Sequence, residues 1–152
     1  MGEVNAHAIA SWRYDAPYDV YNLNPGEIET NVKYFIDAQN ACYSITGEQG
    51  ELIGYCSFGR DAQVPGGDYS QAALDIGMGI RPDLTGQGCG TRYAEAVLDF
   101  AHRTFAPNRF RVTIAAFNQR AQRVWQKLNL RVMQRFLRER DGAPFLILVR
   151  EA

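Results

Sequence analysis

Hydrophobic and polar residues alternate along several short stretches of the chain, a pattern typical of half-buried β-strands. Between Ala73 and Ile80 the apolar side chains fall on one side, and Asp75 falls on the other side with two glycines. The stretch RFRVTIAAF has the same alternation and predicts another strand. Apolar stretches also flank turn residues at 48–51 and at 141–142, which predicts a β-hairpin at each place.

Apolar residues spaced by three and four positions predict helices in other parts of the chain. Asn24 is a candidate N-cap ahead of Pro25 and Glu27, and apolar residues that share one helical face follow it. A longer helix is expected to run from the glycine-rich turn to about Thr104. A short helix is expected after Asn118, its N-cap, with an apolar face formed by Ala121, Val124, Trp125 and Leu128.

The predicted helices and strands interleave without strict β-α-β repetition, which indicates an α/β protein with a mixed sheet. The chain has 152 residues, enough to bury a hydrophobic core in one domain. We find neither an internal repeat nor a low-complexity linker. A single domain over residues 1–152 is therefore expected.

Composition argues against several classes of protein. No run of about 18 apolar residues indicates a membrane span, and the start MGEVNAHAIASW lacks the basic and apolar regions of a secretory signal. The three cysteines and two histidines are too few and too scattered for a disulfide framework or a zinc site. We expect a cytoplasmic protein with reduced thiols, no bound metal and no membrane partner.

Charge is unevenly distributed, although the net charge is −1. Residues 1–76 carry three basic and eleven acidic side chains, whereas residues 77–152 carry thirteen basic and six acidic ones. A basic half can bind nucleic acid or a phosphorylated small molecule, and it can equally be solvated surface. No zinc finger, RGG tract or aromatic RNA-binding signature accompanies the basic residues, so nucleic acid is not the favoured partner.

The stretch RPDLTGQGCGTRY has glycine at positions 86, 88 and 90, where the predicted strand gives way to a helix. Backbone N–H groups at a helix N-terminus can bind a phosphate if no Cβ atoms block its approach. The pattern is neither a P-loop, which ends in Gly-Lys-Ser/Thr, nor the Gly-x-Gly-x-x-Gly fingerprint of dinucleotide sites. A tight connection without a ligand is the alternative.

This glycine turn resembles the acyl-CoA diphosphate loop of the GNAT superfamily of N-acyltransferases, whose pattern is Arg/Gln-x-x-Gly-x-Gly/Ala. Gly88 and Gly90 match the pattern, and Thr85 stands where Arg or Gln is usual. The order of the expected elements agrees with the family over nearly the whole chain. The resemblance therefore implies a mostly antiparallel sheet with splayed strands, flanked by helices.

A second segment, NQRAQRVWQKLNL, resembles the family motif Asn-x-x-Ala-x-x-Leu-Tyr-x-Lys-x-Gly-Phe. Asn118, Ala121 and Lys127 match it, Val124 is a conservative change, and Trp125 replaces the tyrosine. The two motifs occur in the family's order, which makes the resemblance more specific than either motif alone.

The resemblance implies that acetyl-CoA binds between the two strands that splay apart. Main-chain groups of the first strand would contact pantetheine, the glycine turn would bind the diphosphate, and the second motif would flank the pantetheine arm. The implied cofactor-binding residues are Met78, Gly79, Ile80, Thr85, Gly86, Gln87, Gly88, Cys89, Gly90, Thr91, Asn118, Ala121, Val124, Trp125 and Lys127.

The family's reaction implies direct transfer of an acetyl group from the thioester to an amine, which must first lose a proton. Asp75 is the candidate general base, with a structural aspartate as the alternative, and the backbone N–H of Ile80 is the candidate oxyanion donor. Indole cannot act as a useful acid, so Trp125 leaves the leaving thiolate without the family's tyrosine. Tyr93 and Tyr55 are possible substitutes, and both also fit a role as packing aromatics.

We therefore expect an N-acetyltransferase that acts on a primary amine of a small molecule, amino acid or protein. A catalytically inactive acyl-CoA-binding module is the alternative, motivated by Trp125. Aromatic residues between Trp12 and Tyr21 fit an acceptor cleft or a packing wedge equally well. The edge of the final hairpin could pair in a homodimer.

Overall fold

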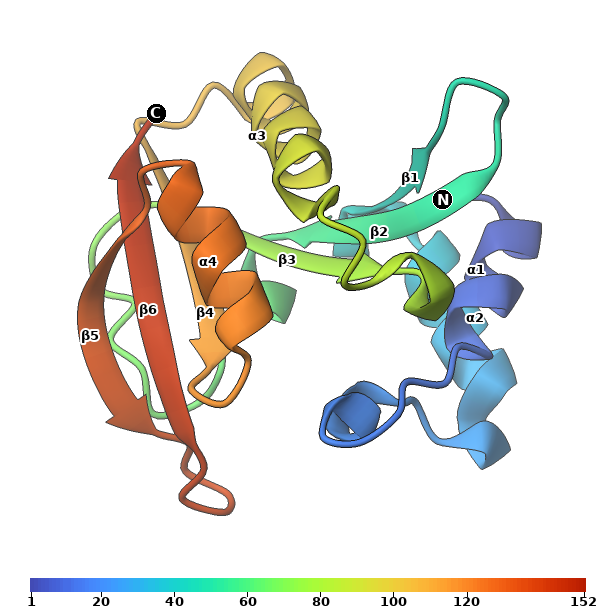
Figure 1. The fold of residues 1–152 in the computed structure, drawn as a ribbon, viewed down its shortest axis with the longest axis horizontal. Helices are drawn as coiled ribbons and strands as arrows, with labels where there is room; N and C mark the ends of the chain where they lie inside the picture. The colour runs from blue at the N-terminus through green and yellow to red at the C-terminus, as the bar shows by residue number, and fades with distance from the viewer.

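The computed structural model describes residues 1–152, and its six strands form one sheet in the order β1-β2-β3-β4-β6-β5 (Figure 1). All neighbouring strands are antiparallel except β3 and β4, which are parallel. The predicted mixed α/β sheet is thus confirmed. The strands are β1 (Cys42–Thr46), β2 (Leu52–Phe58), β3 (Leu74–Ile80), β4 (Arg109–Ala115), β5 (Arg131–Leu137) and β6 (Pro144–Glu151).

Helices cover both faces of the sheet. The long helix α3 (Gly90–Phe105) and the short helix α4 (Gln119–Lys127) pack on one face, in a core with Phe58, Ile76 and Phe110. On the other face, α1 (Glu3–Ala10) and α2 (Ile28–Ile36) form a smaller core with the buried Cys42. None of these helices is both long and apolar enough to cross a membrane.

The predicted alternation in β3 decides which face receives which residue. Ile76 is 2% exposed in the α3 core, and the glycines of β3 lie on the opposite face, where Tyr55 and Ser57 approach them. A Cβ on Gly79 would lie 2.4 Å from Cε1 of Tyr55, so only glycine leaves room for that ring. The strand has no bulge at this glycine, since its pairing with β2 is continuous.

The N-terminal region differs from the prediction in detail. Helix α1 carries only a weak periodic pattern, and the periodicity did not predict it. Asn24 caps a 3₁₀ turn over Pro25–Glu27, with its side chain accepting from Gly26 N–H at 3.0 Å, and the α-helix itself begins at Ile28. The cap is therefore correct in position, but it stabilises a shorter element than expected.

Candidate active site

The first strand of the site, β3, pairs with β4 for only two residues and then separates from it. Leu74 is opposite Phe110 and Asp75 is opposite Arg111, and no further pairs follow. Figure 1 shows β3 continuing toward α1 while β4 runs along α4. A gap therefore opens between the C-terminal half of β3 and α4.

Main-chain groups of β3 face this gap at alternate residues. Arg81 N–H donates to Ile53 O at 2.9 Å, so Gly54 and Ile80 form a non-hydrogen-bonded antiparallel pair. The peptide groups of Met78 and Ile80 consequently point away from β2, toward the gap. Those of Gly79 pair with Tyr55 in β2, so the main-chain contact predicted for Gly79 is already used within the sheet.

A cleft of about 1000 Å³ occupies the gap. Its walls are β3 and the following turn, the start of α3, helix α4, and the N-terminal segment around Tyr14 and Tyr18. The cofactor-binding residues predicted from the sequence all line the cleft except Gln87 and Cys89, whose side chains are exposed. The fold thus brings both family motifs to one cavity.

The glycine turn lies at the N-terminus of α3 and presents unpaired donors. The backbone N–H groups of residues 86–92 donate to no acceptor within the protein. Gly86 and Gly88 have φ of 77° and 85°, values that residues other than glycine adopt only with backbone strain. A Cβ on Gly88 would meet nothing within 4 Å, so the space above the turn is open. This row of donors at a helix N-terminus is suited to an anion.

Gly90 lines the cleft as predicted for a cofactor-binding residue, and it also has a packing role. Its backbone is helical, and a Cβ here would lie 2.9 Å from Cγ2 of Val124. Glycine at position 90 lets the start of α3 approach α4 closely, whereas Gly86 and Gly88 shape the turn itself. Thr85 also acts locally, because its hydroxyl donates to Pro82 O at 2.7 Å.

Helix α4 supplies the opposite wall and much of its charge. Asn118 caps the helix, with Oδ1 accepting from Ala121 N–H at 3.1 Å. Arg120, Arg123 and Lys127 are spaced by three and four residues, and all three line the cleft. The sequence prediction included Lys127 alone, although the i, i+3, i+7 spacing of the three cations on a capped helix could have identified the other two.

Trp125 packs into the main core and also lines the cleft. Only 4% of the residue is exposed. The indole N–H makes no hydrogen bond within the protein. It is not a fully buried atom, because every fully buried side-chain nitrogen and oxygen has a hydrogen-bond partner. The indole therefore borders the cavity as a wall that can donate a hydrogen bond but no proton.

Asp75, the predicted general base, does not line the cleft. It is 2% exposed, and both of its carboxylate oxygens accept from the Arg111 guanidinium, with Nη2 to Oδ2 at 2.8 Å. Gln63 Nε2 also donates to Oδ2 at 2.7 Å. This placement corrects our prediction, because a general base needs a free oxygen that faces its substrate. The structural alternative considered for Asp75 fits these contacts.

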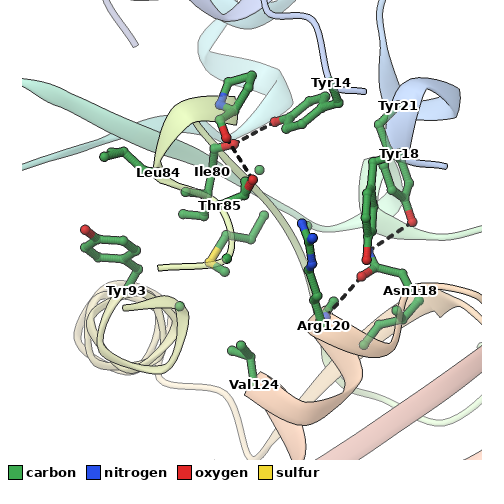
Figure 2. A pocket seen from close by; sticks show the side chains of 18 of the residues that line it. Tyr14, Tyr18, Tyr21, Ile80, Leu84, Thr85, Tyr93, Asn118, Arg120 and Val124 are labelled. Carbon is green, nitrogen blue, oxygen red and sulfur yellow. Dashed lines mark hydrogen bonds between the residues drawn. The ribbon is translucent and has the colours of Figure 1, made fainter. Parts of the chain in front are cut away.

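Three tyrosines line the cleft near the end of β3. The Tyr14 hydroxyl donates to Ile80 O at 2.8 Å, and burial, with a contribution from Tyr55, raises the Tyr14 pKa (Figure 2). Burial raises the pKa of Tyr55 to about 12. Tyr93 extends from the first turn of α3. The surroundings of Tyr55, one of the two proposed substitute acids, therefore oppose proton release.

Two carboxylates line the cleft. Asp83 is held by Arg81, whose Nε lies 2.7 Å from Oδ1, and this hydrogen bond lowers the Asp83 pKa. Asp15 makes no ion pair and no side-chain hydrogen bond. No group of three His, Cys, Asp or Glu side chains is arranged to hold a metal ion.

Comparison with solved structures shows the same fold in acetyltransferases. A GNAT-family acetyltransferase from Bacillus anthracis is 14% identical, with a TM-score of 0.76 over 99% of this chain and 91% of that one. A chimera of the spermidine N-acetyltransferase SpeG from Vibrio cholerae and hSSAT is also 14% identical, with a TM-score of 0.71 over 99% and 92% of the chains. A SpeG variant from Vibrio cholerae is 12% identical, with a TM-score of 0.69 over 99% and 90%.

The sequence itself identifies the family. No curated protein sequence matches the chain. The family model described as "Acetyltransferase (GNAT) domain" matches residues 4–131, which include the glycine turn and the whole of α4. This match, together with the splayed sheet, the open row of N–H groups and the capped helix α4, shows that the chain belongs to the GNAT family of acetyltransferases.

Proposed function

We propose that this acetyltransferase moves an acetyl group from acetyl-CoA to a primary amine by direct attack in a ternary complex. The observation that carries the proposal is the row of unpaired N–H groups at residues 86–92, beside a strand that has parted from its neighbour. A helix N-terminus with free donors favours a diphosphate. A cleft of about 1000 Å³ is large enough for an extended cosubstrate and an acceptor.

The residues present fit acetyl-CoA. The glycine turn would hold its diphosphate, and Arg120, Arg123 and Lys127 would supply positive charge on the facing wall. The peptide groups of Met78 would bond the pantetheine arm in the way a neighbouring strand would, and the N–H of Ile80 would face the acetyl carbonyl. Bound there, acetyl-CoA supplies an activated acyl group.

In the proposed reaction the amine nitrogen bonds to the acyl carbon, the carbon–sulfur bond breaks, and the nitrogen loses a proton. The N–H of Ile80 faces the gap and is the proposed donor to the oxyanion. Since Asp75 is occupied by Arg111, we infer that the amine proton leaves through water in the open cleft. Tyr93 is the candidate proton donor to the departing thiolate, because burial raises the pKa of Tyr55 and makes Tyr55 a poorer acid.

An acceptor amine carries a positive charge before it reacts. Asp15 lines the cleft without a partner, and the aromatic rings of Trp12, Tyr14 and Tyr18 lie in the same wall. A carboxylate and aromatic faces together favour a cation. Small amines, amino acids and peptide N-termini all belong in the acceptor panel, and spermidine joins them because two of the similar structures are spermidine N-acetyltransferases.

The test combines binding with turnover. Calorimetry with acetyl-CoA should show saturable heat, and release of the coenzyme A thiol should depend on one or more amines of the panel. Absence of heat at millimolar acetyl-CoA would contradict the proposed function.

A second candidate function is an acyl-CoA-binding sensor without catalysis. It is favoured by Trp125, which occupies the cleft wall where the family pattern has tyrosine. This alternative predicts saturable acetyl-CoA binding with no thiol release across the whole panel. Under the catalytic hypothesis, Trp125→Tyr keeps or raises turnover.

A further inference from the structure

Residues 14–22 form a loop that is closed by one side chain. The Asn22 amide accepts from Tyr14 N–H at 2.7 Å through Oδ1, and it donates to Tyr14 O at 3.1 Å through Nδ2. Both backbone groups of Tyr14 are thereby fixed to the far end of the loop. Asn22 is half-buried and does not line the cleft. We call residues 14–22 the clamped loop.

The clamped loop touches both walls of the cleft, as Figure 2 shows. On the β3 wall, the Tyr14 hydroxyl donates to Ile80 O at 2.8 Å. On the α4 wall, Asn118 Nδ2 donates to the Tyr21 hydroxyl at 3.2 Å. One short loop thus spans the gap between β3 and α4, and it is anchored at the end of β3 and at the cap of α4.

Aromatic and cationic contacts strengthen the attachment to the α4 wall. The ring centres of Tyr18 and Tyr21 lie 5.8 and 5.9 Å from the ring centre of Phe117. The Arg120 guanidinium carbon lies 4.7 Å from the centre of the Tyr18 ring. Arg120 also borders the glycine turn, since a Cβ on Gly86 would be 3.9 Å from the same carbon. It therefore connects the clamped loop with the proposed diphosphate site.

Ile80, Asn118 and Arg120 all line the proposed acetyl-CoA site and all hold the clamped loop. A ligand that lies between the walls and binds near Arg120 would contact the residues that hold the loop. The loop also carries Asp15 and the tyrosines that line the acceptor side of the cleft. The clamped loop thus borders the proposed sites of both substrates.

We propose that Asn22 is a positioning residue, which holds the clamped loop as the wall of the acceptor site, and that bound acetyl-CoA further orders this wall. The proposal rests on the proposed function, since it assumes that an acyl-CoA occupies the cleft. It implies that the acceptor binds more tightly to the acetyl-CoA complex than to the free protein. Without the two Asn22 hydrogen bonds, several loop residues gain conformational entropy. This entropy is lost when the amine substrate binds, so binding becomes weaker.

The test compares Asn22→Ala with Asn24→Ala. Asn24 is an exposed asparagine nearby that caps its own 3₁₀ turn and lies outside the cleft, so it controls for a general effect on the N-terminal region. Two hydrogen bonds are lost in Asn22→Ala, so we expect the acceptor KM to rise about tenfold. The kcat and the coenzyme A Kd should stay within about threefold of the wild-type values. Asn22→Asp keeps an oxygen that accepts the hydrogen bond from Tyr14 N–H. Its KM for the amine substrate should therefore lie between the values of the wild type and of Asn22→Ala.

A second readout needs no turnover. Hydrogen exchange followed by mass spectrometry should show slower exchange in residues 14–22 of the wild-type protein when coenzyme A is added. This protection should be reduced in Asn22→Ala and kept in Asn24→Ala, with calorimetry confirming that all three proteins bind coenzyme A.

The outcomes separate this inference from the proposed function. If coenzyme A binds but exchange in the clamped loop does not change, or if both alanine variants raise the acceptor KM equally, the loop inference is overturned and the proposed function stands. If the wild-type protein binds no coenzyme A, the proposed function fails and the loop inference fails with it.

Discussion

The two ends of β3 have opposite properties, although they are only a few residues apart. At one end Asp75 and Arg111 are register partners in adjacent strands, and they form an ion pair whose side chains are 3% and 5% exposed. At the other end Met78 and Ile80 are no longer paired with β4, and their peptide groups face a large cleft. The first end holds β3 and β4 together, and the second end leaves room between them.

This difference shows why β3 and β4 separate only at the cleft end. The buried pair is also bound to the surrounding loops, because Gln63 donates to Asp75 and Arg111 Nη1 donates to Gln71 O at 2.9 Å. The strands can part at the cleft because they are fixed immediately before it. A carboxylate on the strand where we expected the general base can therefore stabilise the packing of two strands and take no direct part in proton transfer.

Removing the ion pair should have the largest effect. Asp75→Asn leaves the Arg111 guanidinium buried without a counter-charge, which typically costs about 3–5 kcal/mol. For a chain of this size the melting temperature should fall by about 6–20 °C. Differential scanning calorimetry at neutral pH measures this loss.

The same variant distinguishes architecture from catalysis. A general base contributes about 10²–10⁴ to the rate, whereas we expect the kcat of folded Asp75→Asn to stay within about tenfold of wild type. A double variant, Asp75→Asn with Arg111→Met, should regain part of the lost stability because no charge is then buried alone. A fall in kcat of a hundredfold or more, with loss of one arm of the pH profile, would restore Asp75 as the base.

At the cleft end, Gly88→Val should weaken coenzyme A binding about a hundredfold or more. The side chain would enter the space above the N–H row, and the strained backbone at φ 85° would no longer hold that row in place. Two hydrogen bonds to a charged group, each worth about 1.5–3 kcal/mol, account for this magnitude. Isothermal titration calorimetry with coenzyme A gives the measurement.

Gly142→Val provides the matched control. Gly142 also has a positive φ, 69°, and open space around its Cβ, but it lies in the turn between β5 and β6 and does not line the cleft. Both substitutions should lower stability by similar amounts, and only Gly88→Val should reduce binding. Equal losses of coenzyme A affinity would indicate a general effect of strain and not a diphosphate site.

Sequence patterns predicted most of this architecture because local signals specify it. Alternation defined β3, the glycines marked the turn before α3, and Asn118 marked the start of α4. Partners that depend on tertiary register were not accessible in this way. The pairing of Asp75 with Arg111 joins residues 36 positions apart, and the contact of Tyr14 with Ile80 joins residues 66 apart. No local pattern separates a paired aspartate from a free one.

The three cysteines differ in burial and give a smaller, chemical test of the cleft end. Burial raises the pKa of Cys56, opposite Met78 in β2, to about 12, and raises that of Cys42 to about 11. Cys89 lies exposed in the glycine turn. At pH 8, iodoacetamide should therefore modify Cys89 in the folded protein and leave the other two until unfolding, because the thiolate is the nucleophile.

Coenzyme A should slow the modification of Cys89. At a concentration about ten times its Kd, the free fraction of the protein falls about tenfold, and the labelling rate should fall by up to the same factor. Peptide mass spectrometry follows each thiol separately. Cys89→Ser should still bind coenzyme A, since this side chain does not line the cleft. Unchanged Cys89 labelling at saturating coenzyme A would contradict the placement of the ligand at the turn.

The smallest effect is expected at Asp141, where the hairpin turn carries an exposed version of the buried pair. Arg138 Nη2 lies 2.6 Å from Asp141 Oδ2, and the hydrogen bond from Arg138, followed by that from Ala143 N–H, lowers the Asp141 pKa to about 2. A lowered carboxyl pKa stabilises the fold at pH values above the ordinary carboxyl pKa near 4, and this contribution is lost as pH falls through about 2.

Asp141→Asn should therefore lower the melting temperature at pH 7 by about 2 °C or less, because water and salt screen an exposed pair. The difference from wild type should vanish toward pH 2, and 1 M salt should reduce it at pH 7, whereas the loss caused by Asp75→Asn should be nearly insensitive to salt. Melting curves of both variants in low and high salt measure this contrast, and equal salt dependence would show that burial does not distinguish the two pairs.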